Sequence, residues 1–216
     1  MGLNQGKPPV FGSTHPPPMH LFASFVKSFS AILLYFSVSS NALQYKNDIN
    51  CPKGDFAGFV HNSYLYDRPV DKFTNITKSF FNIPWYGGAD VMNTTGTDNV
   101  PGATRAGTFD GEPFNETLTA YEAGAGALEF TYFGLPAAYV LPNGDHLRFS
   151  YYAETHRYES ICEGTSTFID QVTWWCSNAP RDSFDLWVRL HTVTFDNMAT
   201  TVGARVFTGD CPRTKD

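Results

Sequence analysis

The sequence feature that most limits the possible folds is a run of strand-forming segments over residues 103–176, each separated from the next by a turn signal. The turn signals are Asp110-Gly111, residues 124–126, residues 134–136, Asn143-Gly144 and Glu163-Gly164. Asn143-Gly144 is among the tightest of them, because both residues tolerate the positive φ angles of two-residue turns. This pattern predicts an antiparallel meander of five or six strands.

Different periodicities flank the meander. Residues 56–66 alternate between apolar and polar side chains, which predicts a strand. In residues 70–81 the apolar positions recur every three or four residues, which predicts a short amphipathic helix between Pro69 and Pro84. Apolar residues at near-helical spacing over residues 184–206 predict a long C-terminal helix.

The segments between the short helix and the meander show no such periodicity. Residues 85–88 (Trp-Tyr-Gly-Gly) predict a turn, and residues 93–102 are expected to form a loop because they are rich in Asn, Thr and Gly. The predicted order is a strand, a short helix, the meander and a long helix. This order predicts an α+β fold, in which an antiparallel sheet buries one face against the long helix.

Residues 19–42 have the features of a signal peptide. Lys27 precedes an apolar stretch over residues 31–38, and Ser40-Asn41-Ala42 places small residues where a signal peptidase cleaves. The apolar stretch is well short of the roughly twenty residues that cross a bilayer, so an uncleaved anchor is the less favoured alternative. We therefore expect a secreted, extracellular protein.

Residues 1–18 are rich in Gly and Pro and include three consecutive prolines, a composition that cannot pack as a helix or strand. We expect a disordered extension, or one wrongly included in the chain, with Met19 as the initiator. Residues 43–216 are then the folded domain.

Charge and motifs exclude several classes of partner and reaction. The 216 residues have a net charge of -6 and no run of Lys or Arg, which disfavours nucleic acids and anionic membranes. Membrane contact is expected only through the N-terminal segment before cleavage. Hydrolase, nucleotide-binding and zinc-protease motifs are absent from the sequence. We expect a monomer without a cofactor or metal.

Cysteines and glycosylation sequons agree with export. All four cysteines follow residue 42, and an even number in an exported chain predicts two disulfides. No two cysteines have the short spacing of a zinc knuckle. Sequons for N-glycosylation occur at Asn75, Asn93 and Asn115, which would place these residues at the surface.

Several short motifs occur in the order found in a known superfamily. They are Arg68-Pro69-Val70 with Phe73, Pro84-Trp85-Tyr86, Val100-Pro101-Gly102-Ala103-Thr104-Arg105 and Asn115-Glu116-Thr117-Leu118-Thr119-Ala120-Tyr121. None is specific alone, and their joint order over most of the mature chain carries the similarity. With the predicted order of elements, the chain resembles the START-like (SRPBCC) superfamily, which includes the birch-pollen allergens and the polyketide cyclase/dehydrase proteins.

The resemblance implies a helix-grip fold, in which a curved antiparallel sheet surrounds the long helix and leaves an apolar cavity. Members bind lipids, sterols, hormones or polyketides, and a minority are enzymes. The resemblance also implies that the last strand pairs with the first and that the long helix ends near the Glu163-Gly164 hairpin. It therefore implies disulfides between Cys51 and Cys176 and between Cys162 and Cys211.

Glu116 is the first candidate for chemistry. If Asn115 carries a glycan it points outward, and the alternation of a strand then points Glu116 into the cavity. There, Glu116 could act as a general acid or base with a raised pKa. The favoured alternative is an ion pair with Arg105 at the cavity rim.

Asp170, His156 and Tyr132 are further catalytic candidates. Asp170 alternates with aromatic residues, and His156 lies two residues from Glu154, which could orient its ring. The favoured alternative places Glu154 and His156 on a charged outer face, because the opposite set is more apolar: Phe149, Tyr151 and Ala153. The residues expected to contact a ligand are Trp85, Tyr86, Arg105, Phe130, Tyr151, Trp174 and Trp187.

Three functions remain open. The first is a secreted protein that binds a hydrophobic, lipid or polyketide-like molecule in an internal cavity. The second is a cofactor-independent cyclase, dehydratase or isomerase that uses a cavity carboxylate, and it would be excluded if Glu116 and Asp170 both faced solvent. The third is a secreted interaction protein with a filled core, which a cavity below about 300 Å³ would favour.

Overall fold

The computed structural model describes residues 50–141 and 143–211. The predicted signal peptide and the extension before it lie outside the described residues. Within the described ranges, no helix combines the length and the apolar character that crossing a membrane requires.

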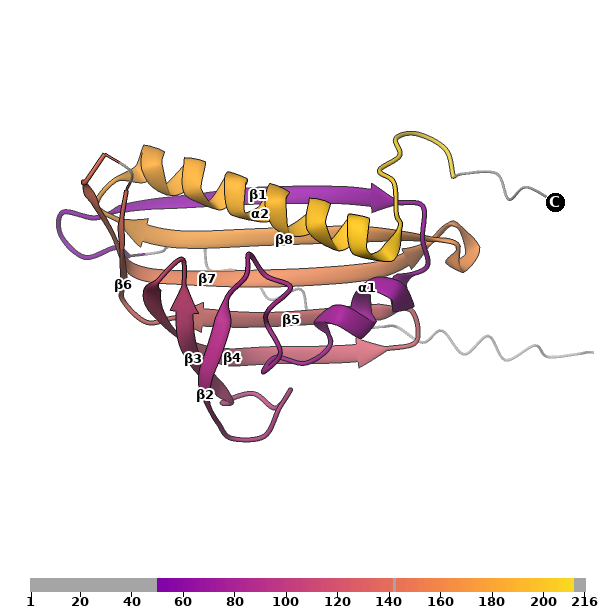
Figure 1. Cartoon of the computed structure of the whole chain (residues 1–216), viewed down its shortest axis with the longest axis horizontal. Coiled ribbons are helices and arrows are strands. Elements are labelled where there is room, and N and C mark those ends of the chain that lie inside the picture. The colour runs from indigo at the N-terminus through magenta and orange to yellow at the C-terminus, as the bar shows by residue number, and fades with distance from the viewer. Residues whose placement is uncertain (1–49, 142, 212–216) are drawn as a thin grey trace, which may run out of the picture. The chain divides into compact units, whose positions relative to one another are not determined.

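The described chain forms one sheet with a long helix along one face (Figure 1). The elements are β1 (Phe56–Tyr66), α1 (Val70–Thr77), β2 (Asp90–Thr95), β3 (Thr104–Phe109), β4 (Glu112–Gly124), β5 (Ala127–Gly134), β6 (Ala137–Val140), β7 (His146–Ile161), the short 3-10 turn η1 (Cys162–Gly164), β8 (Ser166–Ser177) and α2 (Pro180–Val202). The strand order is β1-β8-β7-β5-β4-β3-β2, with β6 paired to β7 and every pair antiparallel. The predicted helix-grip fold is confirmed.

Local signals account for most of these elements. Each turn signal between residues 103 and 176 separates two strands of the meander, as predicted. Helix α2 begins with Pro180 in its first turn, where the missing N–H costs nothing. It ends at Val202, short of the predicted extent to residue 206, because Gly203 takes the left-handed conformation that caps helices.

Two predictions about the N-terminal half of the domain were wrong. Helix α1 ends at Thr77, several residues before Pro84, because the side chains of Asp98 and Asn99 accept the backbone N–H groups of Phe81 and Phe80. These bonds replace the next helical turn. The expected loop over residues 93–102 begins instead with the end of strand β2, which pairs with β3. A polar edge strand needs only backbone partners, so its composition resembles that of a loop.

The core lies between the inner face of the sheet and α2. The helix contributes a buried stripe of Trp187, Leu190, His191, Thr194, Phe195 and Met198. The sheet contributes many aromatic residues, of which the fully buried ones include Tyr66, Phe130, Tyr132, Phe149, Tyr158 and Trp175. Aromatic side chains therefore fill most of the space that the sheet encloses.

A β-bulge in β7 places the residues after Phe149 on the face of the sheet opposite to the one that the sequence predicted. The register with β8 shifts between Phe149 and Tyr151, so the alternation restarts after Phe149. Tyr152, Glu154 and His156 therefore face the core, whereas Tyr151 is exposed. The prediction of a charged outer face for Glu154 and His156 was wrong because an inserted residue changes which face every later side chain occupies.

The two disulfides have the expected partners. Cys51 bonds Cys176 with 5.4 Å between their Cα atoms, and Cys162 bonds Cys211 with 5.5 Å. The first links the segment before β1 to the end of β8, since β1 and β8 pair along their full length. The second ties the segment after α2 to the β7–β8 hairpin.

Candidate functional site

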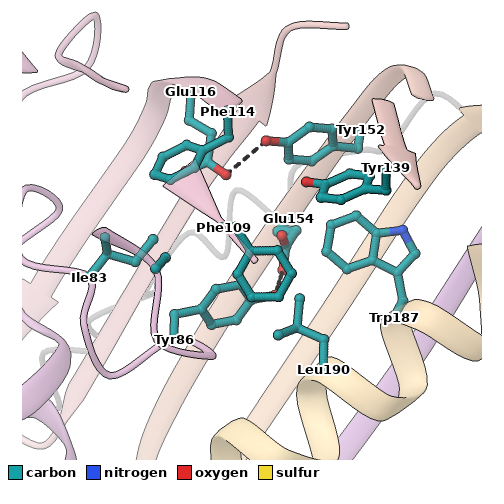
Figure 2. A pocket seen from close by; sticks show the side chains of 11 residues that line it. Ile83, Tyr86, Phe109, Phe114, Glu116, Tyr139, Tyr152, Glu154, Trp187 and Leu190 are labelled. Atoms are coloured by element: carbon teal, nitrogen blue, oxygen red, sulfur yellow. Dashed lines mark hydrogen bonds between the residues drawn. The ribbon is translucent and has the colours of Figure 1, made fainter. Parts of the chain in front are cut away.

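A small cavity lies between the inner face of the sheet and the N-terminal half of α2 (Figure 2). Its lining residues are Ile83, Tyr86, Ala89, Phe109, Phe114, Glu116, Tyr139, Tyr152, Glu154, Trp187 and Leu190. The enclosed space is about 20 Å³, which is room for about one water molecule. Two carboxylates, Glu116 and Glu154, contribute charge to an otherwise mostly aromatic and aliphatic lining.

Glu154 is the centre of a buried polar cluster, which we call the Glu154 cluster: Tyr86, Glu154, His156, Gln171 and His191. Its Oε2 accepts hydrogen bonds from Tyr86 Oη at 2.6 Å and from Gln171 Nε2 at 2.8 Å. The Nε2 atoms of His156 and His191 each lie 3.6 Å from the same oxygen. The other carboxylate oxygen, Oε1, is buried without a hydrogen-bond partner.

Four different elements build this cluster. β7 and β8 place His156 directly opposite Gln171, and Tyr86 comes from the turn before β2. From α2, His191 is held by Asn62 Oδ1, 2.7 Å from its Nδ1, and by Thr173 Oγ1, 3.1 Å from its Nε2. Because an amide oxygen only accepts, Nδ1 of His191 carries a hydrogen in this arrangement.

The environment shifts two pKa values in the cluster downward. Burial raises the pKa of Glu154, but the nearby side chains of His191 and His156 and the hydrogen bond from Tyr86 outweigh burial and lower that pKa to about 2. Burial lowers the pKa of His156 to about 3, and the charge of Glu154 opposes this only in part. At neutral pH, Glu154 is therefore ionised and His156 is neutral.

Glu116 belongs to a second buried cluster with Arg105. The Nε atom of Arg105 donates to Glu116 Oε2 at 2.6 Å, and Tyr152 Oη donates to Oε1 at 2.9 Å. The guanidinium lies over the ring of Phe80 at 4.2 Å and over that of Tyr132 at 4.6 Å, a cation–π arrangement. Burial raises the pKa of Glu116, while Arg105 opposes that rise.

The predicted ion pair is thus present, but its position differs from the expected one. Arg105 is 1% exposed and Glu116 is 5% exposed, so the pair lies in the interior and not at the rim. Arg105 also donates to the backbone carbonyl of Phe80, 2.7 Å away, which connects the cluster to the segment after α1.

The other predicted site residues divide between the two faces of the sheet. Tyr86 and Trp187 line the cavity. His156, Tyr132 and Phe130 are buried in a stack beside it, with Phe130 and His156 ring centroids 4.9 Å apart. Trp85 is half-buried, and its ring lies edge-on to those of Tyr86 and His156.

Three predicted residues lie on the outer face, away from the cavity. Asp170 is half-buried and forms a short ion pair with His61 of β1. Trp174 is half-buried, and Tyr151 is 37% exposed. The structure therefore places no cavity carboxylate at Asp170, because its neighbours Gln171 and Thr173 are the residues of β8 that face inward.

Sequence reasoning missed the central role of Glu154 and did not identify Gln171, His191 or Tyr152. The buried positions of β7 change parity between Phe149 and Tyr152, which marks the bulge, but burial is seen only in the structure and was no signal in the sequence. Nothing in the sequence alone brings His191, which lies on a helix, to a glutamate on β7.

Phe109 and Tyr139 are the half-buried members of the lining and mark the side of the cavity nearest the solvent, which we call its mouth. The rings of Phe109 and Tyr139, both half-buried, lie edge to face with centroids 6.2 Å apart. A Cβ atom at Gly87 would lie 2.5 Å from Leu190 and 2.7 Å from Phe109, so the glycine allows the turn to close over the cavity. Among the described residues, no group of three or more His, Cys, Asp or Glu could hold a metal ion.

Comparisons with known proteins show the fold alone. No family model matches the sequence, and no curated protein matches it. Two solved structures share the fold: a protein from Nitrosospira multiformis (19% identity over 66% of this chain and 94% of that chain, TM-score 0.50) and one from Bacillus thuringiensis (13% identity over 67% and 98%, TM-score 0.51).

A norcoclaurine synthase from Thalictrum flavum also matches, with 14% identity over 68% of this chain and 92% of that chain. Its TM-score of 0.43 is too low to say anything about activity here.

Proposed function

We propose that this protein is exported and binds a small molecule between the sheet and α2, through an N–H or O–H group of the ligand that reaches Glu154. The observation that carries the proposal is the Oε1 atom of this cavity-lining residue, which is buried without a partner. Leaving such an atom unpaired costs about 1–3 kcal/mol. Stability alone would favour an apolar residue at this position.

The aromatic lining indicates the chemistry of the part of the ligand that does not contact Glu154. Phe109, Phe114, Tyr139 and Trp187 offer ring faces and edges to an apolar body, while the charge of Glu116 is already neutralised by Arg105. A ligand that is mostly apolar and carries one donor group fits this lining. The two disulfides support an oxidising compartment as the place where this binding occurs.

Binding requires the mouth to open, because the cavity of about 20 Å³ is far below the roughly 300 Å³ of ordinary ligand sites. Phe109 is the last residue of β3 and directly precedes the exposed turn Asp110-Gly111. Movement of this exposed turn would carry the Phe109 ring away from Leu190. The small volume is also the observation that favours the alternative of an interaction protein with a filled core.

A second candidate function is acid–base catalysis on the bound molecule. The two cavity carboxylates have pKa values shifted in opposite directions, that of Glu116 upward by burial and that of Glu154 downward by its hydrogen bonds. Such a separation gives two carboxylates in one site different roles. In isomerase or cyclase chemistry, Glu116, which is ionised beside Arg105, would act as a general base with a raised pKa, and the ionised Glu154 would stabilise positive charge.

The test combines native mass spectrometry of the secreted protein, after removal of its N-glycans, with titration of the fluorescent probe 1-aminoanthracene. We expect a co-purified small molecule, or binding of the probe. Glu154→Gln should weaken binding of 1-aminoanthracene by about tenfold, because one charge-assisted hydrogen bond is lost. Glu122→Gln, which removes an exposed carboxylate on β4, should leave binding unchanged.

Anthracene, which lacks the amino group, is the matched probe and should bind the wild type and Glu154→Gln equally. If neither probe binds and no added mass is found, the proposal is wrong and the filled-core alternative holds. If both probes bind but Glu154→Gln has no effect, the cavity binds ligands without the proposed anchor.

A further inference from the structure

The outer face of the sheet carries a row of aromatic side chains that no described helix covers. The cross-strand register places Phe59 opposite Trp174, Trp174 opposite Ala153, and Ala153 opposite Phe133. Tyr151 lies two positions from Ala153, and its ring stacks beside that of Phe133, with centroids 6.4 Å apart. We call Phe59, Phe133, Tyr151 and Trp174 the outer aromatic row.

The row is exposed enough to need an explanation. Phe59 is 64% exposed and Tyr151 is 37% exposed, while Leu135, at the end of β5, is 45% exposed. Single exposed apolar residues are normal, but a continuous patch on an exported protein marks a contact surface. Arg157 contacts both Glu129 and Glu159 beside the row, and Asp170 lies against His61, so carboxylates outnumber guanidinium groups around the patch.

The asparagines of two of the three glycosylation sequons point to this same outer face. Asn93 of β2 is opposite Ala106 of β3, which is opposite Asn115 of β4. Directly opposite residues of antiparallel strands point to the same side, and neighbouring strands lie about 4.8 Å apart. The two exposed asparagines are therefore about 10 Å apart on one face, with only an alanine between them.

Asn115 lies directly beside the apolar patch. The N–H of Leu135 donates to the carbonyl of Asn115 at 2.9 Å, so these two residues are cross-strand neighbours. Phe133 is opposite Thr117, which makes it the diagonal neighbour of Asn115, at about 7–8 Å. From Phe133 the rest of the row continues over β7, β8 and β1, about 14 Å across three strand spacings.

We propose that the N-linked glycan of Asn115 lies along the outer aromatic row and shields it, with the glycan of Asn93 at its side. A sugar ring has a face of C–H groups that packs on the negative face of an aromatic ring. Each such contact is weak, but covalent attachment beside the row gives the glycan a high effective concentration there. The two glycans also keep a second copy of the chain from pairing through this face.

The third sequon provides a matched control. Asn75 is exposed on α1, which packs on the opposite side of the sheet. Losing the glycan of Asn75 removes the same mass and the same solubilising group but leaves the outer aromatic row unchanged. Asn75→Gln is therefore compared with Asn115→Gln and with Thr117→Ala, which abolishes the Asn115 sequon without altering the asparagine.

The experiment uses the full chain secreted from eukaryotic cells. Glycopeptide mass spectrometry first determines which of the sequons are occupied. Hydroxyl-radical footprinting then compares oxidation of Phe59, Phe133, Tyr151 and Trp174 between the variants. We expect several-fold faster oxidation of Phe133 and Tyr151 in both variants that lack the Asn115 glycan, and no change in Asn75→Gln. Continued protection of the buried Tyr132 and Trp187 shows that the variants remain folded.

Dimers that form only in the two variants without the Asn115 glycan also support the proposal, since the row would then be available to a second copy. The proposal is wrong if Asn115 carries no glycan in the secreted protein. It is equally wrong if the row is oxidised at the same rate with and without that glycan. Neither result bears on ligand binding, because the cavity lies on the inner face.

Discussion

His156 shows how one buried side chain makes the stability of this protein depend on pH. Its pKa is about 3 in the folded chain, against an ordinary value of 6.5. Below pH 6.5 an unfolded chain binds a proton that the folded chain excludes, so acid favours unfolding. The contribution of His156 to the stability of the folded chain is thus fully present above pH 6.5 and is lost as the pH falls toward 3.

We therefore expect the free energy of unfolding to decrease between pH 6 and pH 4, with a slope of up to about 1.4 kcal/mol per pH unit from His156 alone. His156→Gln should reduce this slope, whereas His146→Gln, at an exposed position of β7, should not. Urea unfolding at several pH values measures the slopes. Equal slopes for the wild type and His156→Gln would show that the buried imidazole does not set the pH dependence.

At the scale of one strand, Gly134 in β5 determines where Tyr152 of the neighbouring strand lies. The two residues are opposite each other in the register of β5 and β7. A Cβ atom at position 134 would overlap the tyrosine ring, so the absence of a side chain lets the ring cross β5 and donate to Glu116. The position of a cavity carboxylate thus depends on a glycine in a neighbouring strand.

Gly134→Ala should displace the Tyr152 ring and lower the free energy of unfolding by about 1–3 kcal/mol, the usual cost of overpacking a core. Gly124→Ala at the end of β4 is the control, because a Cβ atom there meets nothing within 4 Å. Denaturant unfolding compares the two variants. A Gly134→Ala protein as stable as Gly124→Ala would mean that the ring moves without cost.

Strand β7 also shows the limit of reasoning from alternation. A period of two correctly placed Phe149 inside. It failed to predict that Tyr151 lies outside, because the bulge between Phe149 and Tyr151 restarts the alternation. A bulge of this kind depends on the register with β8, which no local window of sequence contains.

For the whole domain, the two disulfides close loops of very different length. Cys51 and Cys176 are separated by 125 residues, and Cys162 and Cys211 by 49. A crosslink limits the unfolded chain more when the loop is longer. The first disulfide encloses β1 to β8, whereas the second encloses mainly β8 and α2.

Removing either disulfide by paired Cys→Ser substitution should lower the free energy of unfolding by about 2–5 kcal/mol, with the larger loss for Cys51 and Cys176. Guanidinium unfolding of the two double variants measures the difference. A larger loss for Cys162 and Cys211 would show that the contact between the tail and the hairpin, and not loop length, dominates.

The sequence by itself determined the features that depend on near neighbours along the chain. Turn pairs such as Asp110-Gly111 and Asn143-Gly144 end strands through their own backbone preferences. The order of elements followed from these signals. The resemblance to the START-like superfamily then supplied the pairing of the last strand with the first and the cysteine pairing that the structure contains.

Only the tertiary structure decided what the interior contains. The Glu154 cluster joins a turn, two strands and a helix, and Glu154 faces His191 because a bulge in β7 turned it inward. Aromatic rings from most strands then reduce the enclosed space to about 20 Å³. Local sequence cannot specify these features, since they depend on contacts between residues far apart in the chain, whose relative positions are fixed only when the whole sheet has closed around α2.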